Sequence, residues 1–143
     1  MTPGARIGRL FACIVAFSAL SACATPWSKS VVALPNGYYL RAKHAGDIWI
    51  VKGDAHSATV GPIAAYSVLN SVVAGALGEV PEVYRTHSND LEFKGTATTR
   101  YFLLDTASGK LESGLDEAAW QSRVTPLNRL GPVRLYAPLP LND

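Results

Sequence analysis

Apolar and polar residues alternate along two neighbouring segments, Tyr38–His44 and Asp47–Lys52, which are rich in aromatic and β-branched side chains. A period of two is typical of half-buried strands, so these segments predict a β-hairpin. The intervening His44-Ala45-Gly46 fits a three-residue loop with Gly46 in the left-handed conformation. A two-residue loop would shift the register and turn one strand over. The position of Gly46 favours the longer loop.

This loop sets the pairing of the two strands and the composition of each face. The predicted pairs are Lys43 with Asp47, Arg41 with Trp49 and Leu40 with Ile50. One face then carries Leu40, Ala42, Ile48 and Ile50. The other carries Tyr39, Arg41, Lys43, Asp47, Trp49 and Val51. The first face is apolar and is expected to meet the core.

The uncharged segment from Ile63 to Leu77 allows two interpretations. Pro62 and Gly78 are suited to the two ends of a helix. Several β-branched residues and a central Asn70-Ser71 turn instead favour two strands, Ile63–Val68 and Val72–Leu77. We favour the strands. A further short strand is expected over Val80–Arg85, followed by a polar loop over Thr86–Thr96.

Thr98–Leu104 predicts another strand, which turns at Asp105 to Gly109 and returns as Leu111–Ser113. The Asp105 carboxylate is expected to accept hydrogen bonds from amides two and three residues on, and Gly109 to adopt a positive φ.

A helix is predicted to begin after Asp116, whose side chain is suited to cap the free amides. Leu115 and Trp120 occupy the positions of a hydrophobic staple, and Trp120 and Val124 lie on one helix face. Pro126 is expected to end this helix. Val133–Tyr136 is interpreted as a final edge strand. Together these elements predict an α+β fold, in which an antiparallel sheet of hairpins carries one C-terminal amphipathic helix on a face.

The N-terminus has the pattern of a secretory signal. Arg6 and Arg9 precede an uncharged apolar run from Leu10 to Leu20, and Ser21-Ala22 supply small residues. Leu20-Ser21-Ala22-Cys23 resembles the lipobox of bacterial lipoproteins. The resemblance implies removal of residues 1–22 and lipid attachment to Cys23. The domains would then be a signal peptide (1–22), a lipid-anchored tether (23–35) and one β-rich globular domain (36–143).

Two alternatives compete with this processing. Cleavage after Ala24 would also fit a small-residue site, and Leu10–Ser28 is long enough to approach a membrane span. Polar residues and Pro26 weaken the span. Ala24 also bears on localisation, because lipoproteins retained in the inner membrane usually carry aspartate after the lipidated cysteine. The resemblance therefore implies the cell envelope, and the outer membrane if the host is Gram-negative.

Charge and cysteine content narrow the function classes. The chain has 13 Lys and Arg residues against 11 Asp and Glu, and loss of Arg6 and Arg9 would leave a neutral domain. A neutral domain lacks the basic surface of nucleic-acid binding proteins, so no nucleic acid is expected as a partner. Loss of Cys13 and acylation of Cys23 would leave no free thiol, and therefore neither a disulfide nor a cysteine nucleophile.

No pattern of catalytic or metal-ligating residues is found. The available metal ligands, which lack a known spacing, are His44, Asp47, Asp54, His56, His87 and Asp90. Ser57 beside His56 would point to the opposite side of a strand. The carboxylate pairs Glu79/Glu82 and Asp90/Glu92 lie in polar segments. We expect no catalytic residue, metal or cofactor.

A binding face is the better candidate. Tyr39, Arg41 and Trp49 share one side of the first hairpin, and such residues are enriched at binding hot spots. Cover by the Trp120 helix or another strand is the alternative.

One more segment points to the same kind of protein. Tyr101–Lys110, followed by Leu115 and Glu117–Trp120, is similar to a segment of small uncharacterised bacterial lipoproteins, which carry no assigned chemistry. We therefore expect a non-enzymatic interaction or structural module, with the membrane and an envelope protein as partners. The alternatives are an inhibitor or immunity lipoprotein against a wall-degrading enzyme or toxin, and a hydrolase with an unrecognised site.

Overall fold

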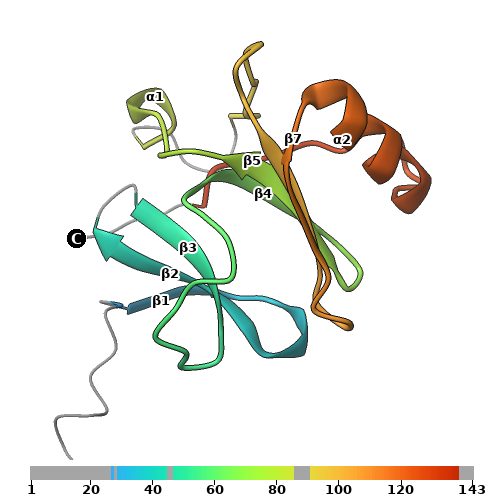
Figure 1. The fold of residues 1–143 in the computed structure, drawn as a ribbon. Coiled ribbons are helices and arrows are strands. Elements are labelled where there is room, and N and C mark those ends of the chain that lie inside the picture. Colours follow the sequence, from blue (N-terminus) through green and yellow to red (C-terminus); the bar gives the residue numbers. More distant parts are fainter. Residues whose placement is uncertain (1–26, 28, 45–46, 86–90, 139–143) are drawn as a thin grey trace, which may run out of the picture.

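The computed structural model describes residues 27, 29–44, 47–85 and 91–138, and its strands form two antiparallel sheets (Figure 1). The first sheet has the order β1-β2-β3, with β1 (Lys29–Ala33), β2 (Tyr38–His44) and β3 (Asp47–Lys52). The second has the order β4-β5-β6-β7, with β4 (Ile63–Leu69), β5 (Val72–Leu77), β6 (Tyr101–Asp105) and β7 (Leu111–Leu115). The helices are α1 (Glu82–Arg85) and α2 (Glu117–Val124), and the 3₁₀ segments are η2 (Pro35–Gly37) and η3 (Thr125–Leu127). The predicted α+β class is confirmed.

Two apolar clusters arrange the elements in three layers. The first cluster joins Leu40 and Ile50 of the first sheet to Phe102 and Leu104 of the second. The second cluster lies on the opposite face of the second sheet and includes Trp120 of α2. The order is therefore first sheet, second sheet, helix (Figure 1). The outer face of the first sheet and α2 lie at opposite ends of this stack.

The register of the first hairpin agrees with the prediction over most of its length. Arg41 pairs with Trp49 and Leu40 with Ile50, but Asp47 pairs with His44 rather than Lys43. The register shifts between Ala42 and His44, which is the signature of a β-bulge. The predicted Lys43–Asp47 pair was wrong because periodicity along a strand does not reveal one extra residue. Residues 45–46 lie outside the described part.

The uncharged segment after Pro62 forms a hairpin of β4 and β5, which confirms the strand interpretation. Asn70 takes a positive φ of 56° in the turn. Gly75 permits a close approach within this sheet, because a Cβ atom there would lie 2.3 Å from the Ala65 carbonyl oxygen and 2.7 Å from the Phe102 ring. If this segment were a helix, β4 and β5 would not form the face of the second sheet that packs on the first sheet.

The two predicted side-chain caps are confirmed. Asp105 Oδ1 accepts hydrogen bonds from the amides of Ala107 (3.0 Å) and Ser108 (3.3 Å), and Gly109 has a φ of 79°. Asp116 Oδ1 accepts from the Ala119 amide at 2.8 Å and caps α2.

Further expectations also differ from the structure. Lys29–Ala33, expected within the tether of residues 23–35, pairs with β2 as an edge strand. Val80–Arg85, expected as a strand, contains the helical turn α1, which follows Pro81 and is closed by a bond from Arg85 Nε to the Val80 carbonyl at 3.0 Å. Val133–Tyr136 forms isolated bridges from Tyr136 to Tyr66 and Glu92 instead of a strand. The bridges of Tyr136 join residues far apart in the chain, which local patterning does not encode, whereas the β1–β2 pairing and the α1 turn are short-range features that the alternation of apolar and polar residues did not reveal.

Candidate functional site

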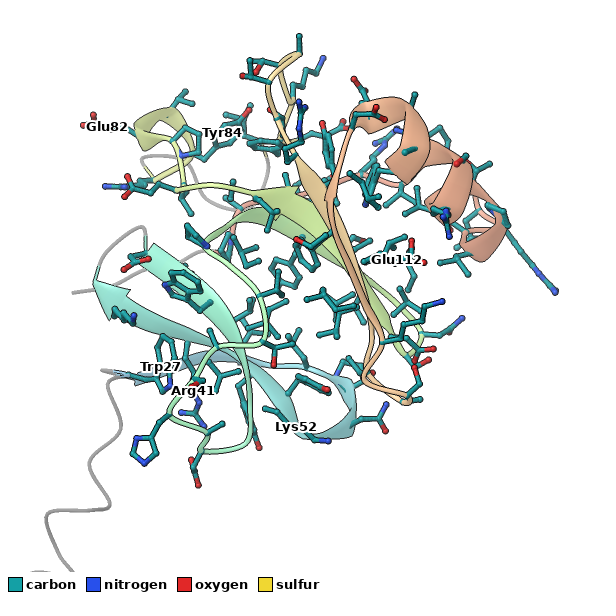
Figure 2. All side chains as sticks on the ribbon, in the orientation of Figure 1. Trp27, Arg41, Lys52, Glu82, Tyr84 and Glu112 are labelled. Atoms are coloured by element: carbon teal, nitrogen blue, oxygen red, sulfur yellow. The ribbon has the colours of Figure 1, made fainter. Side chains whose placement is uncertain are left out.

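The predicted binding residues lie together on the outer face of the first sheet. Tyr39 and Arg41 are two residues apart on β2, and Arg41 faces Trp49 across the β2–β3 pair. All three side chains are half-buried. Figure 2 shows Arg41, with Trp27, on the side of this sheet that points away from the second sheet. We call Trp27, Tyr39, Arg41, Lys43 and Trp49 the aromatic–cationic face.

Arg41 is held by three contacts on this face. Its Nη2 atom lies 3.3 Å from Asp54 Oδ1, and its Nε donates to the Gly53 carbonyl at 3.3 Å. Its guanidinium carbon stands 4.8 Å from the centroid of the Tyr39 ring. The side chain of Arg41 is 16% exposed, whereas that of Asp54 is 92% exposed. Arg41 is thus fixed in place, although its exposed ion pair contributes little to stability.

Lys43 lies between two indole rings. Its Nζ atom is 5.1 Å from the centroid of Trp27 and 5.2 Å from that of Trp49. The Trp49 Nε1 donates a hydrogen bond to Asp47 Oδ1 at 2.6 Å. Cations over aromatic faces gain about 0.5–1 kcal/mol at exposed sites. Lys43 lies at the β-bulge, where the register shifts between Ala42 and His44, and the hairpin pattern did not predict this bulge.

Trp27 is a member of this face that sequence reasoning missed. It is buried to 7% exposure, and its Nε1 donates to the Ala55 carbonyl at 2.9 Å. The sequence offered one signal, because Trp27 is an isolated large aromatic residue among small and polar neighbours. Since it was assigned to the tether, its packing was not anticipated.

The loop of residues 53–62 partly covers the aromatic–cationic face. A Cβ atom on Gly61 would lie 2.7 Å from Cε3 of Trp49, so the backbone of the loop lies directly against the indole. Val60 also bridges to Ile50 on β3. The helix that carries Trp120 packs against the second sheet instead.

The other candidate residues do not assemble into a reactive centre where the structure describes them. His56 is exposed, Asp54 binds Arg41, and Glu79 and Glu82 are exposed. No group of three or more potential metal ligands lies together among the described residues. The side chain of His44, together with His87 and Asp90, falls outside them.

Two tyrosines on the second sheet have pKa values above the usual value for tyrosine. Burial raises the pKa of Tyr66 on β4. Burial, and then the negative charge of Glu117, raise the pKa of Tyr101 on β6. Both hydroxyls therefore stay protonated to a higher pH than an exposed tyrosine would, which is typical of packed structural tyrosines.

A second surface feature lies at the other end of the molecule. Leu127, Leu130 and Val68 border an open hollow of about 550 Å³ beside η3, and Leu130 is 97% exposed. A short turn presents Leu130, because Asn128 Nδ2 donates to the Gly131 carbonyl at 2.9 Å and Asn128 Oδ1 accepts from the Leu130 amide at 3.3 Å. Sequence reasoning missed this feature, since a single leucine in a loop has no periodicity.

Comparison with known proteins finds no family model, no curated protein and no solved structure that matches this chain. Within the described ranges, no helix is long and apolar enough to cross a membrane. The predicted signal peptide, Cys23 and Ala24 lie outside the described residues, as does the alternative span over Leu10–Ser28 apart from Trp27.

Proposed function

We propose that this protein is a lipid-anchored, non-enzymatic interaction module of the cell envelope, held at the membrane through lipid on Cys23. The lipobox-like sequence supports the anchor, and Ala24 supports the periplasmic side of the outer membrane in a Gram-negative host. Two or more acyl chains give stable attachment, because each buried CH₂ contributes about 0.8 kcal/mol.

The observation that carries the binding role is the pre-arranged aromatic–cationic face. Arg41 is fixed by Asp54 and Gly53, and Trp49 is fixed by Asp47. Side chains that are already ordered lose less conformational entropy when a partner binds. Tyr, Trp and Arg are also the residues that dominate binding energy at interfaces. This chemistry favours non-covalent contact with another envelope component through ring faces and paired charges.

The anchor is tested by replacing Cys23 with alanine in the full-length chain. We expect Cys23→Ala to abolish labelling by palmitate and to release the protein from the membrane fraction. Cys13→Ala is the matched control, because Cys13 lies in the segment that would be removed, and it should leave both readouts unchanged. Equal labelling and fractionation of Cys23→Ala and the natural protein would contradict the anchor.

The binding face is tested separately by photo-crosslinking in cells. A photoreactive residue at exposed Ser57, in the loop that binds Trp27 and Arg41, is compared with one at exposed Gln121 on α2. We expect adducts with envelope components at Ser57 in excess of Gln121. The excess should fall in a Tyr39/Arg41/Trp49 triple-alanine variant that still unfolds cooperatively. Equal adducts at both positions would refute the contact face.

A further inference from the structure

We infer that the partner of the aromatic–cationic face is the bilayer surface that holds the lipid anchor. This inference rests on the proposed function, because it takes Cys23 as the point of attachment. It goes further by fixing how the domain is oriented. The face on the first sheet, together with the loop of residues 53–62 that partly covers it, would lie against the lipid headgroups, and α2 would point away from them.

The short connection between Cys23 and Trp27 is the first argument. Four residues of fully extended chain span at most about 14 Å. A folded domain of about 110 residues has a radius of gyration of about 13 Å and is roughly 35 Å across. Because Trp27 is buried and bonded to Ala55, the chain leaves the domain at the outer face of the first sheet. The tether is too short to bring the far end of the domain to the membrane.

The layer order is the second argument. The inner face of the first sheet packs on the second sheet, and α2 packs on the other side of the second sheet. Figure 1 shows α2 and the first sheet at opposite corners of the molecule. With the anchor at Cys23 and the connection meeting the domain at Trp27, the layers stack outward from the bilayer. The exposed Leu130 beside η3 would then face the aqueous compartment.

The chemistry of the face is the third argument. Trp and Tyr concentrate where a membrane meets water, because their rings are apolar with one polar group. Lys and Arg can lay their methylene chains along apolar surface while the charge stays in water. On this face the exposed Lys43 places its Nζ atom 5.1 Å from the ring centroid of the buried Trp27 and 5.2 Å from that of the half-buried Trp49. Their arrangement matches a headgroup layer.

The charges of the face predict how the contact depends on lipid composition. Arg41 and Lys43 are accompanied by Asp54 and Asp47, so the face is close to neutral. A neutral face gains little from an anionic surface, whereas a polybasic segment gains about 1 kcal/mol per cation. The contact should therefore form equally on phosphatidylethanolamine and on mixtures with phosphatidylglycerol.

The test uses the full lipidated protein, reconstituted into vesicles of phosphatidylethanolamine with and without phosphatidylglycerol. Since the processed chain would have no free thiol, Ser57→Cys and Gln121→Cys each provide a single site for a nitroxide spin label. We expect the label at 57 to be several-fold less accessible to a water-soluble nickel chelate than the label at 121. The protection should be the same in both lipid compositions.

Trp27→Ala supplies the second arm. Without the docked indole, the free connection would extend to Lys29 at the start of β1, about 21 Å when extended. We expect the difference between the two labels to shrink while vesicle binding persists and circular dichroism shows a folded sheet.

The outcomes separate the two proposals. Vesicle-bound protein with both labels equally accessible would overturn the orientation and leave the anchor intact. Protein that stays off the vesicles would overturn the anchor itself. Protection that requires phosphatidylglycerol, or that survives Trp27→Ala undiminished, would also overturn the contact as argued. A crosslinked protein at Ser57, with the label at 57 open to water, would assign the face to a protein partner instead.

Discussion

Replacing Thr106 with valine removes a polar contact that joins the two sheets. Thr106 is 4% exposed, and its hydroxyl donates to the Ser71 carbonyl and accepts from Asn36 Nδ2 at 2.9 Å. Asn36 belongs to η2, which connects β1 and β2 of the first sheet, whereas Ser71 and Thr106 lie in two turns of the second. Valine has nearly the shape of threonine, so the substitution tests these hydrogen bonds with little change in packing.

The expected loss follows from the partners that remain. Each net hydrogen bond contributes about 0.5–1.5 kcal/mol. The Ser71 carbonyl keeps its bond from the Thr106 amide at 2.9 Å, and Asn36 is exposed enough to turn to water. We therefore expect Thr106→Val to lower the free energy of unfolding by about 1–2 kcal/mol. For a domain of this size, the melting temperature should fall by about 4–8 °C.

Urea unfolding followed by circular dichroism measures this effect. Thr106→Ser keeps the hydroxyl and is the control for the bonds. Asn36→Gly removes the amide at a position with a φ of 59°, where glycine is tolerated. A double-mutant cycle of Thr106→Val with Asn36→Gly should give a coupling of about 0.5–1.5 kcal/mol. Full stability of Thr106→Val, or strict additivity of the two changes, would refute the reasoning.

Three further predictions concern the second sheet and its helix. Trp120 is 2% exposed in the core, so Trp120→Ala should cost about 3–5 kcal/mol in urea unfolding, whereas Gln121→Ala should change stability by less than about 0.5 kcal/mol. Because the folded-state pKa values of Tyr66 and Tyr101 are raised, the stability that these tyrosines contribute should be full below about pH 10 and be lost above it. In a pH series of melting temperatures, Tyr66→Phe and Tyr101→Phe should each flatten that alkaline decline. An unchanged profile in both variants would contradict this prediction. Leu130→Ser should leave the melting temperature within about 2 °C, since Leu130 is 97% exposed; a larger drop would mean that Leu130 packs in the core.

Local chemistry explains the elements that the sequence predicted well. The cap at Asp116 and the turn at Asp105 need only a carboxylate and amides two or three residues away. The paired strands of residues 38–52 and 63–77 follow from alternation and from a turn between them. These features depend on neighbours in the chain, so they are readable from residue order. The shared face of Tyr39, Arg41 and Trp49 follows from the same alternation.

Only the tertiary structure decided how those pieces meet. Residue order did not show that the hairpins form two sheets, that Lys29–Ala33 adds a strand to the first, or that Trp27 packs against Ala55. It also did not show that Thr106 joins Asn36 to Ser71. The Trp27 and Thr106 contacts join residues that are tens of positions apart, and their free energy comes from surfaces that exist only once the chain has folded. The sequence therefore determined the local elements, whereas long-range packing determined the layer order and the surface next to the proposed anchor.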